Sequence, residues 1–436
     1  MVSGKTFDSI PDELILEIFS RLSTKTIARC RCVSKRWKSS ALIRSGFHHE
    51  DFTELTRPRL LIGVKKEGEW SFYSTLQPQP QNSYEKSSSP VVAATEFHSK
   101  FSKGISEYNC SYASGLIYFH NMRIPREDKD VKRVICNPLT GQYVILPELR
   151  GVSYSYLGFD PIDKEFKVLF MTNPEYIASS GADHYILTLG TGELRWRKIK
   201  CPFTHEPFWE RICIDGVLYY SAHVDYDGGR SSHVIVCFDV RSEAFKLLDL
   251  NRRFDGMINY KGKLCGIYLD YANDGGFPVK LSMRVLEDVE KPEWSNYVYS
   301  FSAQNEVVKV NYVYTLNLSA VGVTASGEIV LSTNSTSNPF YVFYFNPERN
   351  TLQSVEIQGV GGANCENIKC ADYVEGLIVN DAMQLKSSPL QLEGENIVPK
   401  RPEPERRRHT SADLSKSFQS VKSKEPNNSI ILLALS

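Results

Sequence analysis

A pair of hairpin patterns that recurs about every 50 residues constrains this 436-residue chain more than any other feature. In the first hairpin, a turn such as Ser114-Gly115 or Asp215-Gly216 separates two short apolar runs. The corresponding turns fall at positions 115, 164, 216, 262, 327 and 376. A second hairpin alternates with the first, with turns such as Asn137-Pro138 and Asp239-Val240. Two hairpins per repeat predict a four-stranded antiparallel sheet in each repeat.

Such repeats cover residues 51–380 and predict an all-β, kelch-like propeller. Five complete repeats begin near residues 109, 155, 210, 256 and 314. We expect a sixth blade built from both ends of the region, with an inner hairpin from residues 371–379 and an outer hairpin from residues 59–76. Joining the first and last strands in one sheet would remove both exposed sheet edges.

Residues 1–50 predict a small all-α unit of three helices. Between Asp12 and Leu22 the apolar residues recur at spacings of three and four, which indicates one face of a helix. Pro11 suits the first turn of that helix. Because so short a unit buries little surface, we expect an apolar stripe that another protein covers.

Composition excludes several classes of function. The chain has 51 basic and 51 acidic residues, so it lacks an overall field that would attract nucleic acid. Residues 1–50 carry nine Lys or Arg against five Asp or Glu, but these are dispersed over the predicted helices. Neither a membrane-spanning run nor a signal peptide is evident, which favours the nucleus or the cytoplasm.

The ten cysteines are expected to be reduced thiols in such a compartment. Two close pairs occur, Cys30 with Cys32 and Cys365 with Cys370, and each lacks the second Cys or His pair of a zinc site. We therefore expect no metal and no other cofactor. Nucleophile-elbow, metalloprotease and phosphate-binding-loop motifs are also missing from the sequence.

The segments Ile10-Pro11-Asp12-Glu13-Leu14 and Val33-Ser34-Lys35-Arg36-Trp37 closely resemble the F-box of large plant families. Ser23 departs from the family, which often has proline there. The resemblance implies binding to a Skp-type adaptor and, through it, to a cullin ubiquitin ligase. Its adaptor contacts would be Ile10, Pro11, Leu14, Ile18, Leu22, Val33, Ser34 and Trp37. The alternative is that these side chains form only the core of a three-helix unit.

Residues 51–380 resemble, more diffusely, the F-box-associated domain of plants. In an antiparallel blade the mid-blade loops and the connections between blades leave the same face. We place the loops at residues 120–131, 171–183, 222–233 and 269–279, and long connections at 202–209 and 359–367. The candidate target-binding residues on them are Tyr176, Phe208, Trp209, Tyr226, Arg230, Tyr271 and Phe277. The alternative for each is packing within its own loop.

Together these features predict a non-catalytic substrate-recognition subunit of an SCF-type ubiquitin ligase. The F-box would hold the adaptor and the propeller loops would hold an unknown target protein. A propeller scaffold without a role in ubiquitination, and a propeller glycoside hydrolase, are the alternatives. Residues 381–436 have one aromatic residue, Phe418, and predict a disordered tail.

Overall fold

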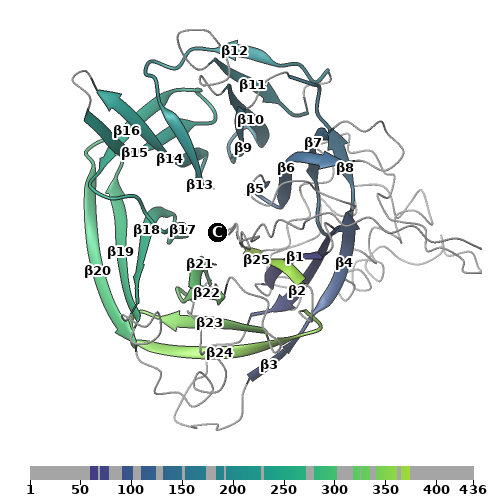
Figure 1. The fold of residues 1–436 in the computed structure, drawn as a ribbon, viewed down its shortest axis with the longest axis vertical. Helices are drawn as coiled ribbons and strands as arrows, with labels where there is room; N and C mark the ends of the chain where they lie inside the picture. The colour runs from purple at the N-terminus through teal and green to yellow at the C-terminus, as the bar shows by residue number, and fades with distance from the viewer. Residues whose placement is uncertain are drawn as a thin grey trace, which may run out of the picture.

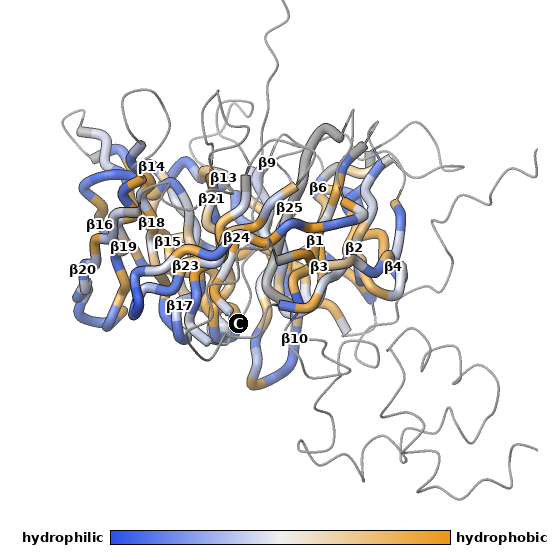
Figure 2. The backbone as a smooth tube through the Cα atoms, turned by 90° about the horizontal axis from the view of Figure 1, so that it is seen from below, coloured by the Kyte–Doolittle hydropathy of each residue, from blue (hydrophilic) through white to orange (hydrophobic). Residues whose placement is uncertain are grey.

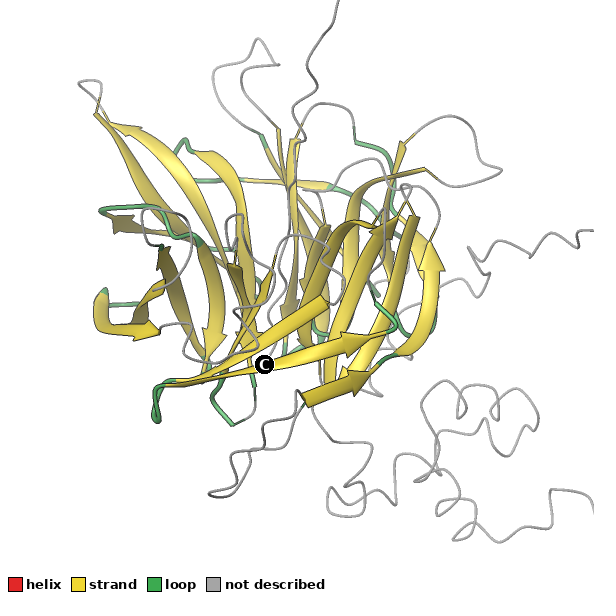
Figure 3. Cartoon of the chain, turned by 60° about the horizontal axis from the view of Figure 1, so that its bottom comes forward, coloured by secondary structure: helices red, strands yellow, loops and turns green. Residues whose placement is uncertain are grey.

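Six antiparallel β-sheets surround a central axis in the computed structural model (Figure 1). The structure describes residues 59–66, 69–77, 91–101, 110–123, 131–149, 153–172, 183–190, 193–226, 230–271, 279–301, 318–324, 326–333, 340–360 and 365–373. Strands, turns and bends make up all of these ranges, and no described segment is a helix suited to crossing a membrane (Figure 3). The six-bladed propeller is therefore confirmed. The predicted helices in residues 1–50 and the tail in residues 381–436 lie outside the described ranges.

The blades are numbered from the first complete repeat. The strands of each blade are given in their order in the sheet, from the central axis outward. Blade 1 comprises β5 (Cys110–Ala113), β6 (Leu116–Arg123), β7 (Val131–Cys136) and β8 (Tyr143–Ile145). Blade 2 comprises β9 (Ser153–Asp160), β10 (Glu165–Thr172), β11 (His184–Thr188) and β12 (Arg197–Ile199). Blade 3 comprises β13 (Glu206–Ile214), β14 (Val217–Tyr226), β15 (Arg230–Asp239) and β16 (Phe245–Leu250).

The remaining blades complete the ring. Blade 4 comprises β17 (Gly256–Tyr260), β18 (Lys263–Asp270), β19 (Val279–Asp288) and β20 (Glu293–Phe301). Blade 5 comprises β21 (Leu318–Val323), β22 (Ile329–Thr333), β23 (Phe340–Asn346), β24 (Thr351–Gln358) and β3 (Val91–Ala94). Blade 6 comprises β25 (Cys365–Tyr373), β1 (Arg59–Lys66), β2 (Glu69–Leu76) and β4 (Glu96–Phe101).

The inner hairpins owe their tight turns to residues that tolerate positive φ. Ser114 and Gly115 have φ values of 40° and 86°, and Asp215 and Gly216 have values of 44° and 83°. Two consecutive positive φ values are the signature of a type I′ turn, whose twist matches that of the flanking strands. Lys164 takes the same place in blade 2, with a φ of 56°. The turn residues predicted from the repeat therefore do close these hairpins.

Blade 6 joins the two ends of the propeller, as predicted, but with a different division of strands. Of the described residues near the C-terminal end, β25 alone joins this blade, and it pairs directly with β1. The other three strands come from the N-terminal side, in the order β1, β2 and β4. The prediction of two strands from each end is therefore wrong. It overlooked β4, whose polar and apolar residues alternate weakly, and which pairs with β2 across a β-bulge.

The strand β3 was not predicted and adds a fifth strand to blade 5. It pairs in parallel with β24, from Val91 opposite Val355 to Ala94 opposite Gln358. Thr95, just after β3, donates a hydrogen bond from its hydroxyl to the carbonyl oxygen of Gln358, at 2.9 Å. A parallel partner distant in sequence leaves no hairpin signal, so local patterns could not reveal it.

The antiparallel order divides the propeller into two faces. The turn face carries the tight hairpin turns, and the loop face carries the mid-blade loops and the connections between blades. Several predicted loops are shorter than expected, because strands extend into them. The clearest case is residues 222–233, where β14 and β15 stay paired as far as Tyr226 opposite Arg230. Residues 227–229 alone separate the two strands.

Apolar side chains fill the spaces between blades. Hydrophobic residues predominate along middle strands such as β15, whereas outer strands such as β20 are more hydrophilic (Figure 2). Trp70 is buried against the ring of Phe72 on its own strand and the ring of Phe119 in blade 1. The Trp196 indole donates a hydrogen bond to the Pro147 carbonyl oxygen of blade 1, at 2.9 Å. These tryptophans are therefore part of the packing between blades.

Candidate functional site

Blade 3 brings together four of the seven residues predicted to contact a target. Phe208 and Trp209 lie in β13, and Tyr226 and Arg230 face each other at the loop-face ends of β14 and β15. Tyr271 follows β18 in blade 4. Tyr176, Phe277 and all eight predicted adaptor contacts lie outside the described residues. The candidate site is therefore the loop-face end of blade 3.

A wide β-bulge in β13 sets the direction of this part of the strand. Pro207 pairs with Ala222 and Arg211 pairs with Tyr220, so three residues of β13 oppose Ser221 alone. These three residues, 208–210, interrupt the ladder and turn the strand. The Tyr156 hydroxyl of blade 2 donates a hydrogen bond to the Phe208 carbonyl oxygen, at 2.6 Å, and holds the bulge in place.

The ring of Phe208 lies against two histidines on the neighbouring strands. Its centroid is 5.0 Å from that of His223, in an edge-to-face arrangement, and 6.3 Å from that of His233. The two imidazoles are themselves 4.4 Å apart, because His223 and His233 are directly opposite in the β14–β15 ladder. All three side chains are half-buried, so part of each remains accessible to a partner.

Arg253, in the connection from blade 3 to blade 4, also lies against the ring of Phe208. Its guanidinium lies 4.6 Å from the ring centroid. The same guanidinium donates two hydrogen bonds to the Glu210 carboxylate, one of them from Nε to Oε2 at 3.1 Å. Cation–π contact and a bidentate ion pair together restrict the Arg253 side chain. We call Phe208, Glu210, His223, His233 and Arg253 the blade 3 cluster.

Sequence analysis did not connect His223 with His233. Burial, together with the neighbouring His223 and Arg253, lowers the pKa of His233 below its ordinary value. These neighbours therefore favour the neutral form of His233. The signal that could have located the pair is Asp227-Gly228-Gly229, because a three-residue turn centred on residue 228 pairs residue 223 with residue 233.

Tyr271 lies at the contact between blades 4 and 5, away from the blade 3 residues. Its hydroxyl accepts a hydrogen bond from the backbone N–H of Leu318, at 2.9 Å, and donates one to the Leu318 carbonyl oxygen, at 3.2 Å. These bonds join blade 4 to the innermost strand of blade 5. The half-buried side chain therefore connects two blades, which differs from the alternative of packing within its own loop. Its contact with a target stays a prediction.

A second cluster that sequence analysis missed lies between blades 2 and 3. His184, Cys201 and His205 have ligand atoms within 4.8 Å of one another, and this is the one such group of three or more potential metal ligands in the described residues. Burial lowers the pKa of His205 to about 3 and raises the pKa of Cys201 to about 11. The histidine is therefore neutral, and the cysteine is a thiol, at neutral pH. A search for close cysteine pairs missed the cluster, because it has one cysteine and because His184 is distant from Cys201 in sequence.

A cavity of about 360 Å³ opens between blades 4 and 5. Its lining includes Tyr260, Tyr297, Tyr299 and Lys261. Lys261 belongs to the inner turn of blade 4, so this cavity lies toward the turn face, away from the blade 3 cluster.

Comparison with known families assigns the N-terminal segment and the propeller each to a protein family. Residues 7–47 match the F-box domain, and residues 59–378 match the F-box associated beta propeller domain. F-box only protein 12 of Arabidopsis thaliana is 57% identical over 434 residues, covering 97% of this chain and 91% of the relative. The Arabidopsis thaliana F-box protein At1g30930 is 60% identical over 398 residues, covering 88% of this chain and 99% of the relative.

Solved structures offer much weaker similarity. A mutant of the Synechocystis apocarotenoid oxygenase aligns with a TM-score of 0.31 and 10% sequence identity, covering 69% of this chain and 78% of the oxygenase chain.

Proposed function

Because this chain belongs to the plant F-box proteins that carry an F-box-associated β-propeller, we propose that it is the substrate-recognition subunit of an SCF-type ubiquitin ligase. The observation that supports the proposal is the presence of both modules in one chain, an adaptor-docking F-box followed by a rigid binding scaffold. The chain would make no covalent bond itself. It would raise the effective concentration of a target lysine near a ubiquitin-charged enzyme.

The F-box would dock onto a Skp-type adaptor through Ile10, Pro11, Leu14, Ile18, Leu22, Val33, Ser34 and Trp37. Leu14→Asp tests this part, because a carboxylate in an apolar interface loses its hydration without gaining a partner. Co-purification of the full chain with the adaptor should then be lost. Thermal unfolding of the propeller should stay unchanged in the same variant. Adaptor binding that survives Leu14→Asp would contradict the proposal and favour a propeller scaffold with no ligase partner.

The target would bind at the loop-face end of blade 3. Support comes from the half-buried Phe208 and Arg253, and from the presence of Trp209, Tyr226 and Arg230 in β13, β14 and β15, since Tyr, Trp and Arg are the commonest energetic anchors of protein interfaces. Trp209→Ala and Tyr226→Ala should each reduce capture of ubiquitinated targets by about tenfold, without loss of adaptor binding. Affinity purification with mass spectrometry, comparing these variants with Leu14→Asp, would identify the proteins concerned. Target capture retained by both variants would move the site to another part of the propeller.

The alternatives make distinguishable predictions. An SCF receptor should accelerate ubiquitin transfer to its target only when the adaptor site is intact. A glycoside hydrolase would instead show turnover that is indifferent to Leu14→Asp. Action on nuclear or cytoplasmic targets is part of the same proposal, and a fluorescent fusion of the full chain tests it.

A further inference from the structure

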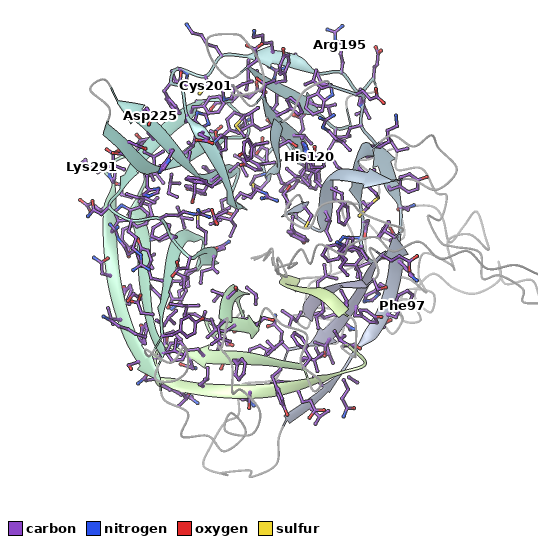
Figure 4. The ribbon with its side chains drawn as sticks, viewed as in Figure 1. Phe97, His120, Arg195, Cys201, Asp225 and Lys291 are labelled. Carbon is purple, nitrogen blue, oxygen red and sulfur yellow. The ribbon has the colours of Figure 1, made fainter. Side chains whose placement is uncertain are left out.

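Three potential metal ligands converge on the loop face where blade 2 meets blade 3. His184 begins β11 of blade 2, whereas Cys201 and His205 lie on the connection that leads from β12 to β13. Cys201 and His205 are separated by three residues, a spacing that is usual for ligand pairs in zinc sites. Figure 4 shows Cys201 in the upper part of the ring, near the blade 3 strands that carry Asp225.

The geometry is close to that of a metal site. The Sγ atom of Cys201 lies 3.9 Å from Nδ1 of His205, and the ligand atoms of all three residues lie within 4.8 Å of one another. In a tetrahedral zinc site, metal–ligand bonds of 2.0–2.3 Å place neighbouring ligand atoms roughly 3.5 Å apart. Binding would therefore need a contraction of about 1 Å, which rotations of the side chains can supply.

The surroundings orient His205 as a metal ligand. Its Nε2 lies 2.8 Å from the hydroxyl of Tyr220, a side chain that is fully buried. When Nε2–H donates to that hydroxyl, the lone pair of the imidazole is on Nδ1, which is the nitrogen nearer to Cys201. Histidines that bind metals usually donate their other ring N–H to an oxygen in this way.

Apolar packing holds the rings in place. The His184 and His205 rings are 5.3 Å apart, and Phe245 meets the His184 ring edge to face at 5.5 Å. Phe203 lies 5.3 Å from the His205 ring. His184 and His205 are buried, whereas Cys201 is half-buried, so the thiol is on the side through which a cation could enter.

We propose that His184, Cys201 and His205 bind one Zn²⁺ ion. One sulfur and two nitrogen ligands suit zinc and not the hard cations Mg²⁺ and Ca²⁺, which prefer oxygen. On binding, the Cys201 thiol releases its proton to solvent and coordinates as a thiolate, while both imidazoles bind as neutral ligands. Three protein ligands leave the fourth position to a water molecule. The ion would join blade 2 to the start of blade 3.

The test measures zinc bound by the full-length protein, purified under reducing conditions, exposed to ZnSO₄ and freed of loose metal by gel filtration. We expect one zinc per chain in the wild type. Cys213→Ser is the matched control, because both cysteines are half-buried and each thiol lies near a phenylalanine carbonyl oxygen, Cys201 at 3.2 Å from that of Phe203 and Cys213 at 3.6 Å from that of Phe159. It should keep its zinc, whereas Cys201→Ser and His184→Asn should lose it.

Two further measurements make the outcome decisive. Zinc should raise the melting temperature of the wild type and Cys213→Ser but not of Cys201→Ser, and circular dichroism should show that all three are folded. Tyr220→Phe, which removes the hydroxyl beside His205, should weaken zinc affinity about 10- to 100-fold. A wild-type chain without stoichiometric zinc, or a Cys201→Ser chain with as much zinc as the wild type, would overturn the proposal. Unchanged affinity in Tyr220→Phe would overturn Nδ1 as the ligand atom of His205.

Discussion

The guanidinium of Arg253 is stacked on Phe208 at 4.6 Å and is held there by a bidentate ion pair with Glu210. These contacts join the bulge of β13 to the connection that leads into blade 4. A partner that docks on Phe208 therefore meets a ring whose position is already fixed. Such a surface loses less side-chain entropy on binding than a mobile one.

Replacing Arg253 with lysine should weaken target capture by about tenfold. Lysine keeps the positive charge, but it cannot make the bidentate pair or stack its planar group on Phe208. The matched control is Arg241→Lys, because Arg241 makes a comparable bidentate pair with Asp163. That pair lies on the turn face, so the control should bind the target like the wild type. Quantitative pull-down of both variants checks the difference, and equal binding would count against the blade 3 cluster.

Breaking the ion cluster between blades 2 and 3 should destabilise the propeller. Glu243 of blade 3 accepts hydrogen bonds from Lys167, at 3.0 Å, and from Arg197, both in blade 2. Burial alone would raise the pKa of Glu243, but the bonds from these cations outweigh it and lower the pKa. Glu243→Gln would leave the buried Lys167 ammonium without its carboxylate, which should cost about 3 kcal/mol.

Urea unfolding at neutral pH measures this loss, with Glu290→Gln as the control. Glu290 pairs with Lys246 at 3.2 Å, but its side chain is 87% exposed. Its replacement should change the unfolding free energy by less than about 1 kcal/mol. Similar losses of unfolding free energy in the two variants would show that the ion cluster of Glu243, Lys167 and Arg197 contributes no more to stability than an exposed ion pair.

His120 should make the propeller sensitive to acid. Its Nδ1 lies 2.5 Å from the Ser155 hydroxyl. Figure 4 shows His120 near the central axis of the propeller. Burial, aided by Arg133 and Arg211, lowers the pKa of His120 to about 3. An unfolded chain binds this proton near its ordinary pKa of about 6.5. The unfolded state therefore takes up the proton first, and stability falls as the pH drops below that value.

One proton of this kind reduces the unfolding free energy by about 1.4 kcal/mol per pH unit. The loss should continue between about pH 6.5 and about pH 3, where folded His120 itself titrates. His120→Gln removes the titrating group, so stability should depend less steeply on pH in that variant. Urea unfolding at pH 7, 6 and 5 provides the comparison; an identical slope in both proteins would refute the assignment.

Gly266 in β18 should not tolerate a side chain. A Cβ atom at this position would lie 2.1 Å from the ring of Phe254, which is 1% exposed and cannot move into solvent. Gly266→Ala should therefore destabilise the protein by about 1–3 kcal/mol. Gly256→Ala is the control, since the nearest atom to its Cβ would be the Ala320 carbonyl oxygen, at 3.9 Å. Thermal denaturation of the two variants measures the difference, and equal melting temperatures would contradict the close packing.

Local chemistry explains why most of the fold could be predicted. The hairpin turns depend on a few adjacent residues, such as Ser114-Gly115 and Asp215-Gly216, and their φ values match what the sequence implied. The same local reasoning failed for the strand extents at residues 222–233. There the ladder continues to Tyr226 and Arg230, because pairing with a neighbouring strand decides where a strand ends.

The candidate site was predicted only in part. Phe208, Trp209, Tyr226 and Arg230 came from the expected loops and do lie at one end of blade 3. The partners that restrain Phe208 were not predicted, because Arg253 and His233 approach it from other strands and connections. Whether these residues bind a target stays a prediction.

The amino-acid sequence by itself determined the F-box motif, the repeated pairs of hairpins and the turns of the inner hairpins, since each depends on residues close together in the chain. Only the tertiary structure decided how blade 6 closes, that β3 joins blade 5, and which side chains meet between blades. The ring brings residues as distant as Arg211 and Cys110 into hydrogen-bonding contact. Contacts of this kind arise from closure of the whole propeller, and no local pattern encodes them.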